Sequence, residues 1–490
     1  LPAPPFIAAV KSDDVVTKQG ARQPSRRPPF SWDKLPVFFH SANASGPWSA
    51  AAAKQIARFA MATNEKNHGS ECDSFFRSLR TSLTSNWWST VMLADGTRQS
   101  EELAGPAACR QIASEGTGTA TFFYLNSIID WSTNFKLHQN MVDNPAWREK
   151  NASGGDMLKL NNYMYALEVT AMKAAWIKTC VDAVKAGCSG CFIDQANVDV
   201  AGDAQAGGAT KADAQAWSAG HLAALVELSH ELAATGNYPI LNHFGVSGPR
   251  AKGMSSPIAM MIEVSAATHS LSISEQQKSL TQAAAQDFVG SETCVTKLQA
   301  IAGRGFTVQA HAGDLPRGEQ WGGSGQGNQC VDGDTNSMAA FLVAAEPFSF
   351  YHCSFANTTA GGTIWSSAAT WPAVHDSWLS WLPEYDFPLG APNGPATSVP
   401  SAHNLTGVVH TSACNQPFTA LRIHTDRAVQ QQSPHVWTRT FASGTTAVFD
   451  GGSGQGTIRW AHGKTQVGLP YTNASVARLV AEQGCRWEDV

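Results

Sequence analysis

Eight short apolar segments alternate along this chain with longer stretches of helical periodicity. Each segment is apolar nearly throughout, which is typical of parallel strands covered on both faces. The segments are 35–40, 58–63, 119–126, 190–195, 238–243, 258–264, 306–311 and 348–353. The helical stretches 168–187 and 212–236 end at Gly187 and Gly236, as helices commonly do. Eight strand-then-helix units predict a (β/α)8 TIM barrel; an open doubly wound sheet is the main rival, but no glycine-rich phosphate loop follows the first strand.

Beyond residue 384 the pattern changes. A segment rich in proline and glycine, 385–397, is followed by short β-like stretches with turn signals at Gly444, Gly451 and Gly454. Such a series predicts a small antiparallel β-sandwich. We therefore divide the chain into an extended N-terminal segment (1–34), the barrel (35–384), and a linker with the C-terminal sandwich (385–490).

Charge and hydropathy exclude two classes of partner. The net charge is −5 and only 15% of the residues are charged, so we expect no nucleic-acid partner. No apolar stretch reaches the ~18 residues that a membrane helix needs, so we expect no membrane insertion.

Ten cysteines and five Asn-x-Ser/Thr sequons indicate an oxidising, glycosylating compartment. We predict a disulfide-bonded glycoprotein that is secreted, extracellular or at the cell surface. These features are also compatible with a protein that forms part of an extracellular assembly. Cys188 and Cys191 form a CxxC pattern, but without a second ligand pair we interpret them as a structural disulfide or buried thiols rather than a zinc or redox site. The predicted glycosylation sites are Asn43, Asn151, Asn357, Asn404 and Asn473.

Polar residues end all eight apolar segments, while the interiors of the segments contain almost none. In a barrel, catalytic residues lie at these carboxyl ends of the strands. Asp194 and Glu263 each directly end an apolar run, "CFID" and "MMIE". Two carboxylates facing one pocket are what glycosidic cleavage requires, because one protonates the leaving oxygen and the other attacks the sugar or activates water. Asp194 and Glu263 are the predicted catalytic pair. The alternative for Asp194 is a cap of the next segment, and the alternative for Glu263 is an ion pair with a neighbouring cation.

Other polar residues at the strand ends are predicted to bind substrate. The histidines come from different strands without the spacing of a metal motif, so we expect sugar contacts or packing, and neither a metal nor a cofactor. The predicted substrate-binding residues are His40, Glu65, Asn126, Asp199, His243 and His311.

The segments "RFAMATNEK", "FFYLNSIIDW", "CFIDQANVD", "YPILNHFG" and, further on, "VWTRTFASGTTAVFD" resemble a glycoside-hydrolase-like (β/α)8-barrel family, over residues from about 35 to 460. The family is similar in architecture to the α-galactosidase-type clan. The resemblance implies that Asp194 is the nucleophile and Glu263 the acid/base. This sequence departs from the clan in having Glu rather than Asp at the end of the sixth strand, and Asn64 before Glu65.

Two functions from different classes fit these features. The first is a secreted glycoside hydrolase that cleaves a poly- or oligosaccharide by a two-carboxylate, retaining mechanism. The alternative is a catalytically inactive, glycosylated extracellular protein that binds carbohydrate or has a structural role. A polysaccharide lyase or metal-dependent hydrolase has only the histidines at the strand ends in its favour. Carbohydrate is the expected partner in either main case.

Overall fold

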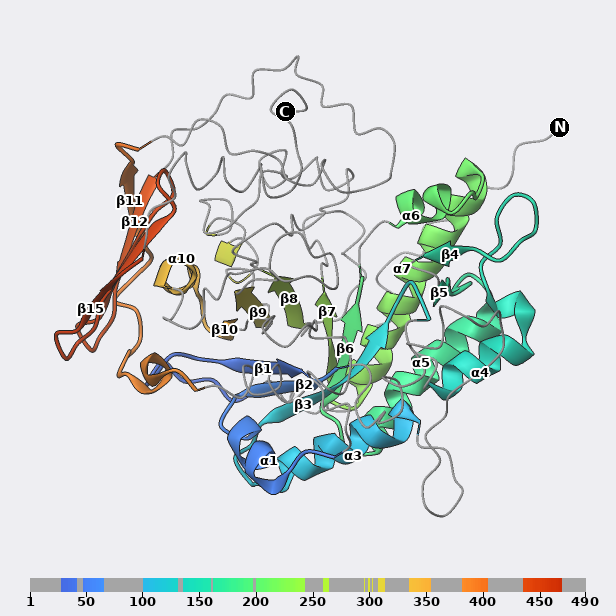
Figure 1. Cartoon of the computed structure of the whole chain (residues 1–490), viewed down its shortest axis with the longest axis horizontal. Coiled ribbons are helices and arrows are strands. Elements are labelled where there is room, and N and C mark those ends of the chain that lie inside the picture. The colour runs from blue at the N-terminus through green and yellow to red at the C-terminus, as the bar shows by residue number, and fades with distance from the viewer. Residues whose placement is uncertain are drawn as a thin grey trace, which may run out of the picture.

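The fold is taken from a computed structural model of the chain, shown in Figure 1. It describes residues 28–41, 47–65, 100–130, 135–159, 162–196, 200–242, 259–263, 307–312, 335–353, 381–403 and 435–468, with the single positions 295, 298, 299 and 302.

The main element is an eight-stranded parallel sheet in the order β1-β2-β3-β6-β7-β8-β9-β10. Every strand predicted from the apolar segments is present, to within about three residues at its ends, and the strand residues whose burial is described are buried, except Asp194 at the end of β6, which is half-buried. The strands are β1 (Phe38–Ser41), β2 (Met61–Asn64), β3 (Ala120–Asn126), β6 (Gly190–Asp194), β7 (Tyr238–Asn242), β8 (Ala259–Glu263), β9 (Thr307–Ala312) and β10 (Ser349–Cys353).

The first and last strands of this sheet come together. Val37, just before β1, forms a parallel bridge with Tyr351 of β10, and the Tyr351 amide donates to the Pro36 carbonyl over 2.8 Å. The two edge strands of the row, β1 and β10, are therefore neighbours (Figure 1).

Helices follow the strands and pack on the outside of the sheet. Helix α5 packs against β3 and β6, and α7 against β7. Both were predicted from periodicity, and the chain leaves them through glycines with positive φ, Gly187 (121°) and Gly236 (76°). The helices are α1 (Ala50–Ile56), α3 (Glu101–Ala113), α4 (Lys136–Asp143), η1 (Pro145–Trp147), α5 (Thr170–Lys185), α6 (Ala201–Ala206), α7 (Lys211–Ala234), α10 (Thr335–Ala344) and η5 (Pro383–Asp386).

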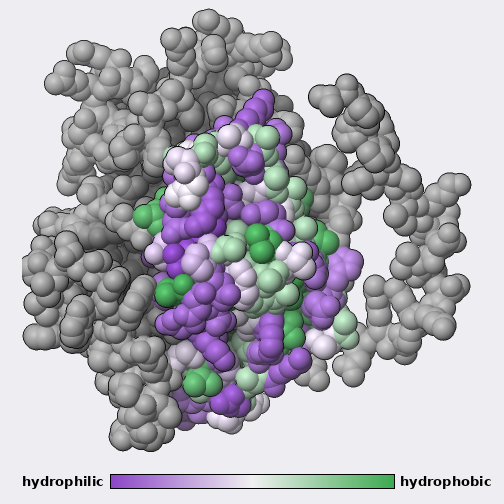
Figure 2. Space-filling model, turned by 90° about the vertical axis from the view of Figure 1, so that its right-hand side faces the viewer, coloured by the Kyte–Doolittle hydropathy of each residue, from purple (hydrophilic) through white to green (hydrophobic). Residues whose placement is uncertain are grey.

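A second, smaller hydrophobic cluster lies beyond the carboxyl ends of β3 and β6. Its residues come from segments 127–169 and 200–217, as far as these are described, and the first segment also contains the hairpin of β4 (Leu158–Lys159) and β5 (Asn162–Tyr163). We call these two segments the rim unit. Met157, Met164 and Trp217 are fully buried in it. Figure 2 looks at the face formed by the rim unit and the neighbouring helices, which is mainly hydrophilic with small separate hydrophobic spots.

The C-terminal region contains a five-stranded antiparallel sheet in the order β11-β12-β13-β14-β15. Burial alternates along β13 and β14, as in a sheet with one covered face. Helix α10 packs against β13 and β14 and also touches β9, so it lies between the two sheets (Figure 1). The structure thus confirms an antiparallel C-terminal sheet. The strands are β11 (Thr397–Pro400), β12 (His435–Thr440), β13 (Thr446–Asp450), β14 (Gln455–Arg459) and β15 (Thr465–Val467).

No helix within the described ranges is long and apolar enough to cross a membrane.

Candidate functional site

Asp194 ends β6, and its carboxylate accepts four hydrogen bonds. Oδ2 accepts from the Tyr124 hydroxyl (2.8 Å) and Asn126 Nδ2 (3.1 Å). Oδ1 accepts from Asn242 Nδ2 (2.9 Å) and from the backbone amide of Gln195 (2.8 Å). These donors come from β3, from β7 and from the residue that follows β6. Four donors on a half-buried carboxylate stabilise its charge and fix its orientation.

The donors are themselves held in place. Asn126 Oδ1 accepts the amides of Ile128 and Ile129, both at 2.8 Å, which leaves its Nδ2 to face Asp194. The Asn126 carbonyl accepts from Trp176 Nε1 at 2.9 Å. Burial raises the pKa of Tyr124 well above its usual value, and the negative charges of Asp194 and Glu65 raise it further. Tyr124 therefore stays a neutral phenol that can donate to the carboxylate.

The backbone turns sharply directly after Asp194. Gln195 has φ 54°, and it is one of two non-glycine residues with positive φ in the described part of the chain. Such a conformation costs roughly 1–3 kcal/mol and persists where the surroundings impose it. It lets the Gln195 amide face the Asp194 carboxylate while the Ala196 amide donates to the Asn242 carbonyl over 3.0 Å.

A buried histidine–carboxylate pair lies near this carboxylate. His40 Nε2 and Glu65 Oε1 are 2.6 Å apart, and both side chains are almost fully buried. The His40 ring contacts the Phe192 ring edge to face, with centroids 4.5 Å apart, and Phe192 stacks on Tyr124. The pair lies at the carboxyl ends of β1 and β2. It is linked to Asp194 through the rings of Phe192 in β6 and Tyr124 in β3.

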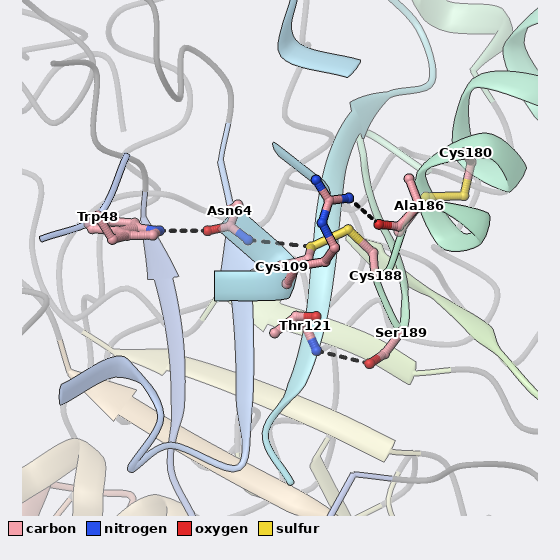
Figure 3. Close-up of a disulfide and its surroundings, with 10 residues drawn as sticks. Trp48, Asn64, Cys109, Thr121, Cys180, Ala186, Cys188 and Ser189 are labelled. Atoms are coloured by element: carbon pink, nitrogen blue, oxygen red, sulfur yellow. Dashed lines mark hydrogen bonds between the residues drawn. A yellow bond between two sulfur atoms is a disulfide. The ribbon is translucent and has the colours of Figure 1, made fainter. Parts of the chain in front are cut away.

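Two disulfides fix the strands behind the site (Figure 3). Cys109 of α3 bonds Cys188, and Cys180 of α5 bonds Cys191 of β6. Each cysteine of the CxxC pattern thus has a distant partner, which confirms the structural interpretation over a redox pair or a zinc site. Asn64 Nδ2 donates to Cys109 Sγ at 3.5 Å, and Asn64 Oδ1 accepts from buried Trp48 Nε1 at 2.9 Å (Figure 3).

The structure brings four of the predicted site residues together: His40, Glu65, Asn126 and Asp194. Glu263 is the last residue of β8 and His311 lies in β9 beside it in register, but their side chains fall outside the described part. Asn151 is described and lies in the rim unit. Predicted residues outside the described ranges are Asp199, His243, Asn43, Asn357, Asn404 and Asn473.

Two residues of the site were not among the predicted site residues. Tyr124 lies inside the apolar run "TFFYLN", where a tyrosine is indistinguishable from a core residue. Asn242 is the second-last residue of the fifth predicted strand and ends β7, so the rule of polar residues at strand ends could have selected it as it selected Asn126.

Two carboxyl groups of the rim unit have raised pKa values. Burial raises the pKa of Glu149 to about 8, and the neighbouring carboxylates Glu168 and Asp213 raise it as well. Burial also raises the pKa of Asp130, against the opposing effect of its hydrogen bond to His138. Within the described ranges, no group of three or more His, Cys, Asp or Glu side chains is arranged to hold a metal ion.

Comparison with protein families gives the class of the protein. Residues 118–445 match a glycoside hydrolase family model, which covers more than half of the chain. The chain therefore belongs to hypothetical glycosyl hydrolase family 15. A comparison with curated protein sequences gives no significant match.

Several solved structures are similar at low identity. The glycoside hydrolase domain of PelA from Pseudomonas aeruginosa is 13% identical, with 66% of this chain and 94% of that domain covered and a TM-score of 0.35. The α-galactosidase AgaA from Geobacillus stearothermophilus is 9% identical (88% and 48% covered, TM-score 0.38). The α-galactosidase TtGalA from Thermus thermophilus is 12% identical (56% and 50% covered, TM-score 0.31). This chain spans about half the length of either α-galactosidase.

Proposed function

We propose that the protein is a glycoside hydrolase that cleaves glycosidic bonds in an oligo- or polysaccharide and retains the anomeric configuration. The observation that carries the proposal is the carboxylate of Asp194, held by four donors at the carboxyl end of a central parallel strand. A nucleophilic carboxylate has to be fixed in direction, and the four hydrogen-bond donors support that role. Membership of a glycosyl hydrolase family supports the same reaction class.

The proposed fold for this reaction is a closed (β/α)8 barrel. The bridge between Val37 and Tyr351 supports closure, because it joins the two ends of the eight-stranded row. In a barrel the carboxyl ends of all eight strands surround one opening. Residues from β1, β2, β3, β6 and β7 would then line one site, as their contacts with Asp194 and with one another already suggest.

Glu263 is the proposed acid/base. Asn242 of β7 contacts Asp194 and pairs in register with Met261 of β8. Alternate residues of a strand share a face, so position 263 belongs to the same face of the sheet as position 261. Strands β6 and β8 are separated by β7 alone. The shared face and the short separation support Glu263 as the second carboxyl group of the site, and retention requires the two carboxyl groups to lie about 5–5.5 Å apart.

The proposed reaction then runs in two displacements. The Asp194 carboxylate attacks the anomeric carbon as Glu263 gives its proton to the departing glycosidic oxygen, which leaves a sugar ester on Asp194. Glu263, now a carboxylate, removes a proton from water, and the resulting attack on the anomeric carbon frees Asp194. Asn126 uses its amide group on the backbone and on Asp194, so we assign it to orienting the nucleophile. His40 and Glu65 remain the proposed substrate contacts.

We propose that this hydrolase acts outside the cell. Two buried disulfides, Cys109–Cys188 and Cys180–Cys191, support an oxidising compartment. A polymeric or oligomeric carbohydrate is the substrate class that such a location offers.

Turnover of carbohydrate tests the proposal. The purified chain is incubated with a panel of aryl glycosides and with polysaccharides of differing sugars, and released reducing ends are measured. Asp194→Asn should lower the rate at least ~10³-fold, as expected for loss of a nucleophile. Asp182→Asn is the matched control, since Asp182 is a half-exposed carboxylate on α5 paired with Lys178. Full activity in Asp194→Asn would refute the assignment, and carbohydrate binding without any turnover would favour the non-catalytic alternative.

A further inference from the structure

Asp194 is also held from behind, through its main chain. Its carbonyl oxygen accepts two hydrogen bonds from Ser127, one from the amide (3.0 Å) and one from the hydroxyl (2.8 Å). Ser127 follows β3 and is fully buried. The Ser127 hydroxyl lies 3.0 Å from His221 Nε2, and His221 is a fully buried residue of α7.

The direction of these hydrogen bonds follows from counting protons. A serine hydroxyl has one hydrogen, and here it is donated to the Asp194 carbonyl. The bond between Ser127 and His221 must therefore use a hydrogen on His221 Nε2, with the serine oxygen as acceptor. His221 thus orients the hydroxyl, and the hydroxyl orients the Asp194 carbonyl.

The peptide group between Asp194 and Gln195 transmits this restraint to the carboxylate. A peptide group is planar, with its C=O and N–H pointing in opposite directions. When Ser127 fixes the carbonyl at one end, the Gln195 N–H at the other end is fixed as well, and it donates to Asp194 Oδ1 over 2.8 Å. The left-handed φ of Gln195, 54°, is the backbone conformation that accompanies this orientation.

We infer that Ser127 and His221 are positioning residues that lock the Asp194–Gln195 peptide so that its N–H faces the carboxylate. The inference rests on the proposed function for its consequence in catalysis, because it makes the pair an aid to the nucleophile. Its structural content does not depend on turnover: without the pair, the peptide group loses a restraint and the Gln195 and Ala196 amides lose protection.

Amide hydrogen exchange tests the structural content without any substrate. Peptides that cover residues 190–196 are followed in the wild type, Ser127→Ala and His221→Leu. We expect exchange at Gln195 and Ala196 to be at least ~10-fold faster in both variants. Ser127→Thr keeps the hydroxyl, and His221→Gln keeps a donor, so both should restore slow exchange. Ser229→Ala, another buried position of α7, is the matched control and should leave these peptides unchanged. Should Ser127→Ala fail to fold, the comparison of His221→Gln with His221→Leu decides the question.

Kinetics test the catalytic consequence. With an aryl glycoside that the wild type hydrolyses, Ser127→Ala and His221→Leu should lower kcat about 10- to 100-fold with little change in KM. The rescue variants should recover most of the rate. Unchanged exchange at Gln195 and Ala196 in Ser127→Ala and His221→Leu would overturn the inference. Faster exchange in these two variants, combined with a wild type that hydrolyses no substrate, would support the positioning role of Ser127 and His221 and refute only the proposed hydrolase.

Discussion

Tyr124 shows how a single residue can give the proposed nucleophile a permanent hydrogen-bond donor. Its hydroxyl donates to Asp194 Oδ2 at 2.8 Å, and burial, Asp194 and Glu65 all raise its pKa. A phenol that does not ionise near neutral pH is a permanent donor to the carboxylate.

Replacing Tyr124 by Phe should therefore reduce turnover while leaving the fold intact. We expect kcat to fall about 10- to 100-fold, the range for loss of one oriented donor at a reacting group. Tyr163→Phe is the control, because Tyr163 is a half-buried residue of the β4–β5 hairpin whose ring contacts Arg148. Steady-state rates on the same aryl glycoside compare the two. Equal rates in Tyr124→Phe and the wild type would contradict the role given to the hydroxyl.

At the scale of elements, the strands of the parallel sheet could be predicted from the sequence, but the rim unit between them could not. The eight apolar segments correspond to β1, β2, β3 and β6–β10 because parallel strands are buried on both faces, which leaves an unbroken apolar pattern. The same rule located Asp194, His40, Glu65 and Asn126, since strand ends share one edge. Tyr124 was not predicted as a site residue, because its neighbours in the sequence are apolar.

The rim unit and the pairing of the cysteines could not be predicted from the sequence, because both depend on contacts in the folded structure. Short pieces such as η1, β4 and β5 carry too few residues for a periodic signal. Met157 and Met164, which flank the β4–β5 hairpin, are buried in one cluster with Trp217. Cysteine spacing gave no pairing, because Cys188 and Cys191 bond to residues on two different helices. Strand β11 was missed since its sequence, "TSVP", begins where a Pro/Gly linker was expected.

Glu149 makes the stability of the rim unit depend on pH. Its pKa is raised from 4.5 to about 8, mainly by burial and then by Glu168. The folded state therefore holds a proton that the unfolded chain releases between these two values. The stability that this group contributes is fully present below pH 4.5 and is lost as the pH rises through 8. Between these two values the loss is about 1.4 kcal/mol per pH unit.

Glu149→Gln should remove this dependence, because a glutamine stays neutral. Denaturant unfolding at a series of pH values between 5 and 9 measures it. We expect the variant to gain stability over the wild type as the pH rises, with the two curves closest at the acid end. Glu231→Gln, at an exposed position of α7, serves as control. Parallel curves for the wild type and Glu149→Gln would contradict the prediction.

The sequon at Asn151 lies in an exposed turn of the rim unit. Asn151 Oδ1 accepts from the Ser153 amide (3.1 Å), the Ser153 hydroxyl (2.7 Å) and the Gly155 amide (2.9 Å). These bonds hold the side chain through its oxygen and leave Nδ2, the atom that carries an N-glycan, without a hydrogen bond in the described part of the chain. Residues 152–155 are exposed, so a glycan can be accommodated without unfolding the turn.

We therefore predict that Asn151 carries an N-glycan when the chain is secreted from eukaryotic cells. Peptide mass spectrometry before and after enzymatic deglycosylation gives the occupancy. Ser153→Ala should abolish it and Ser153→Thr should preserve it, since the sequon requires a hydroxyl at that position. An unmodified Asn151 in a secreted sample would count against the site.

At the scale of the whole molecule, two interlaced disulfides join α3, α5 and β6. Cys109–Cys188 spans 79 residues and Cys180–Cys191 spans 11. If cross-links act by restricting the unfolded chain, the longer loop contributes more, about 4 kcal/mol against about 3 kcal/mol. Cys191 is also three residues before Asp194, so the short loop anchors the strand that carries the site.

Removal of each disulfide should separate the two effects. We expect the double substitution of Cys109 and Cys188 by Ala to lower the free energy of unfolding more than that of Cys180 and Cys191. The second pair should cost more activity per folded molecule, because it anchors β6. Denaturant unfolding and specific activity, measured on the same samples, give both quantities. The expectation would be contradicted if loss of Cys180–Cys191 lowered the free energy of unfolding more and loss of Cys109–Cys188 lowered the specific activity more.

The central claim is that Asp194 forms a covalent bond with the sugar. Incubation with activated fluoroglycosides, which slow the second displacement, followed by peptide mass spectrometry tests it most directly. The account predicts a single glycosyl adduct on the peptide that contains Asp194, and no adduct in Asp194→Asn. Turnover of the parent glycosides with the adduct on another carboxylate, or with inversion of the anomeric configuration, would contradict it.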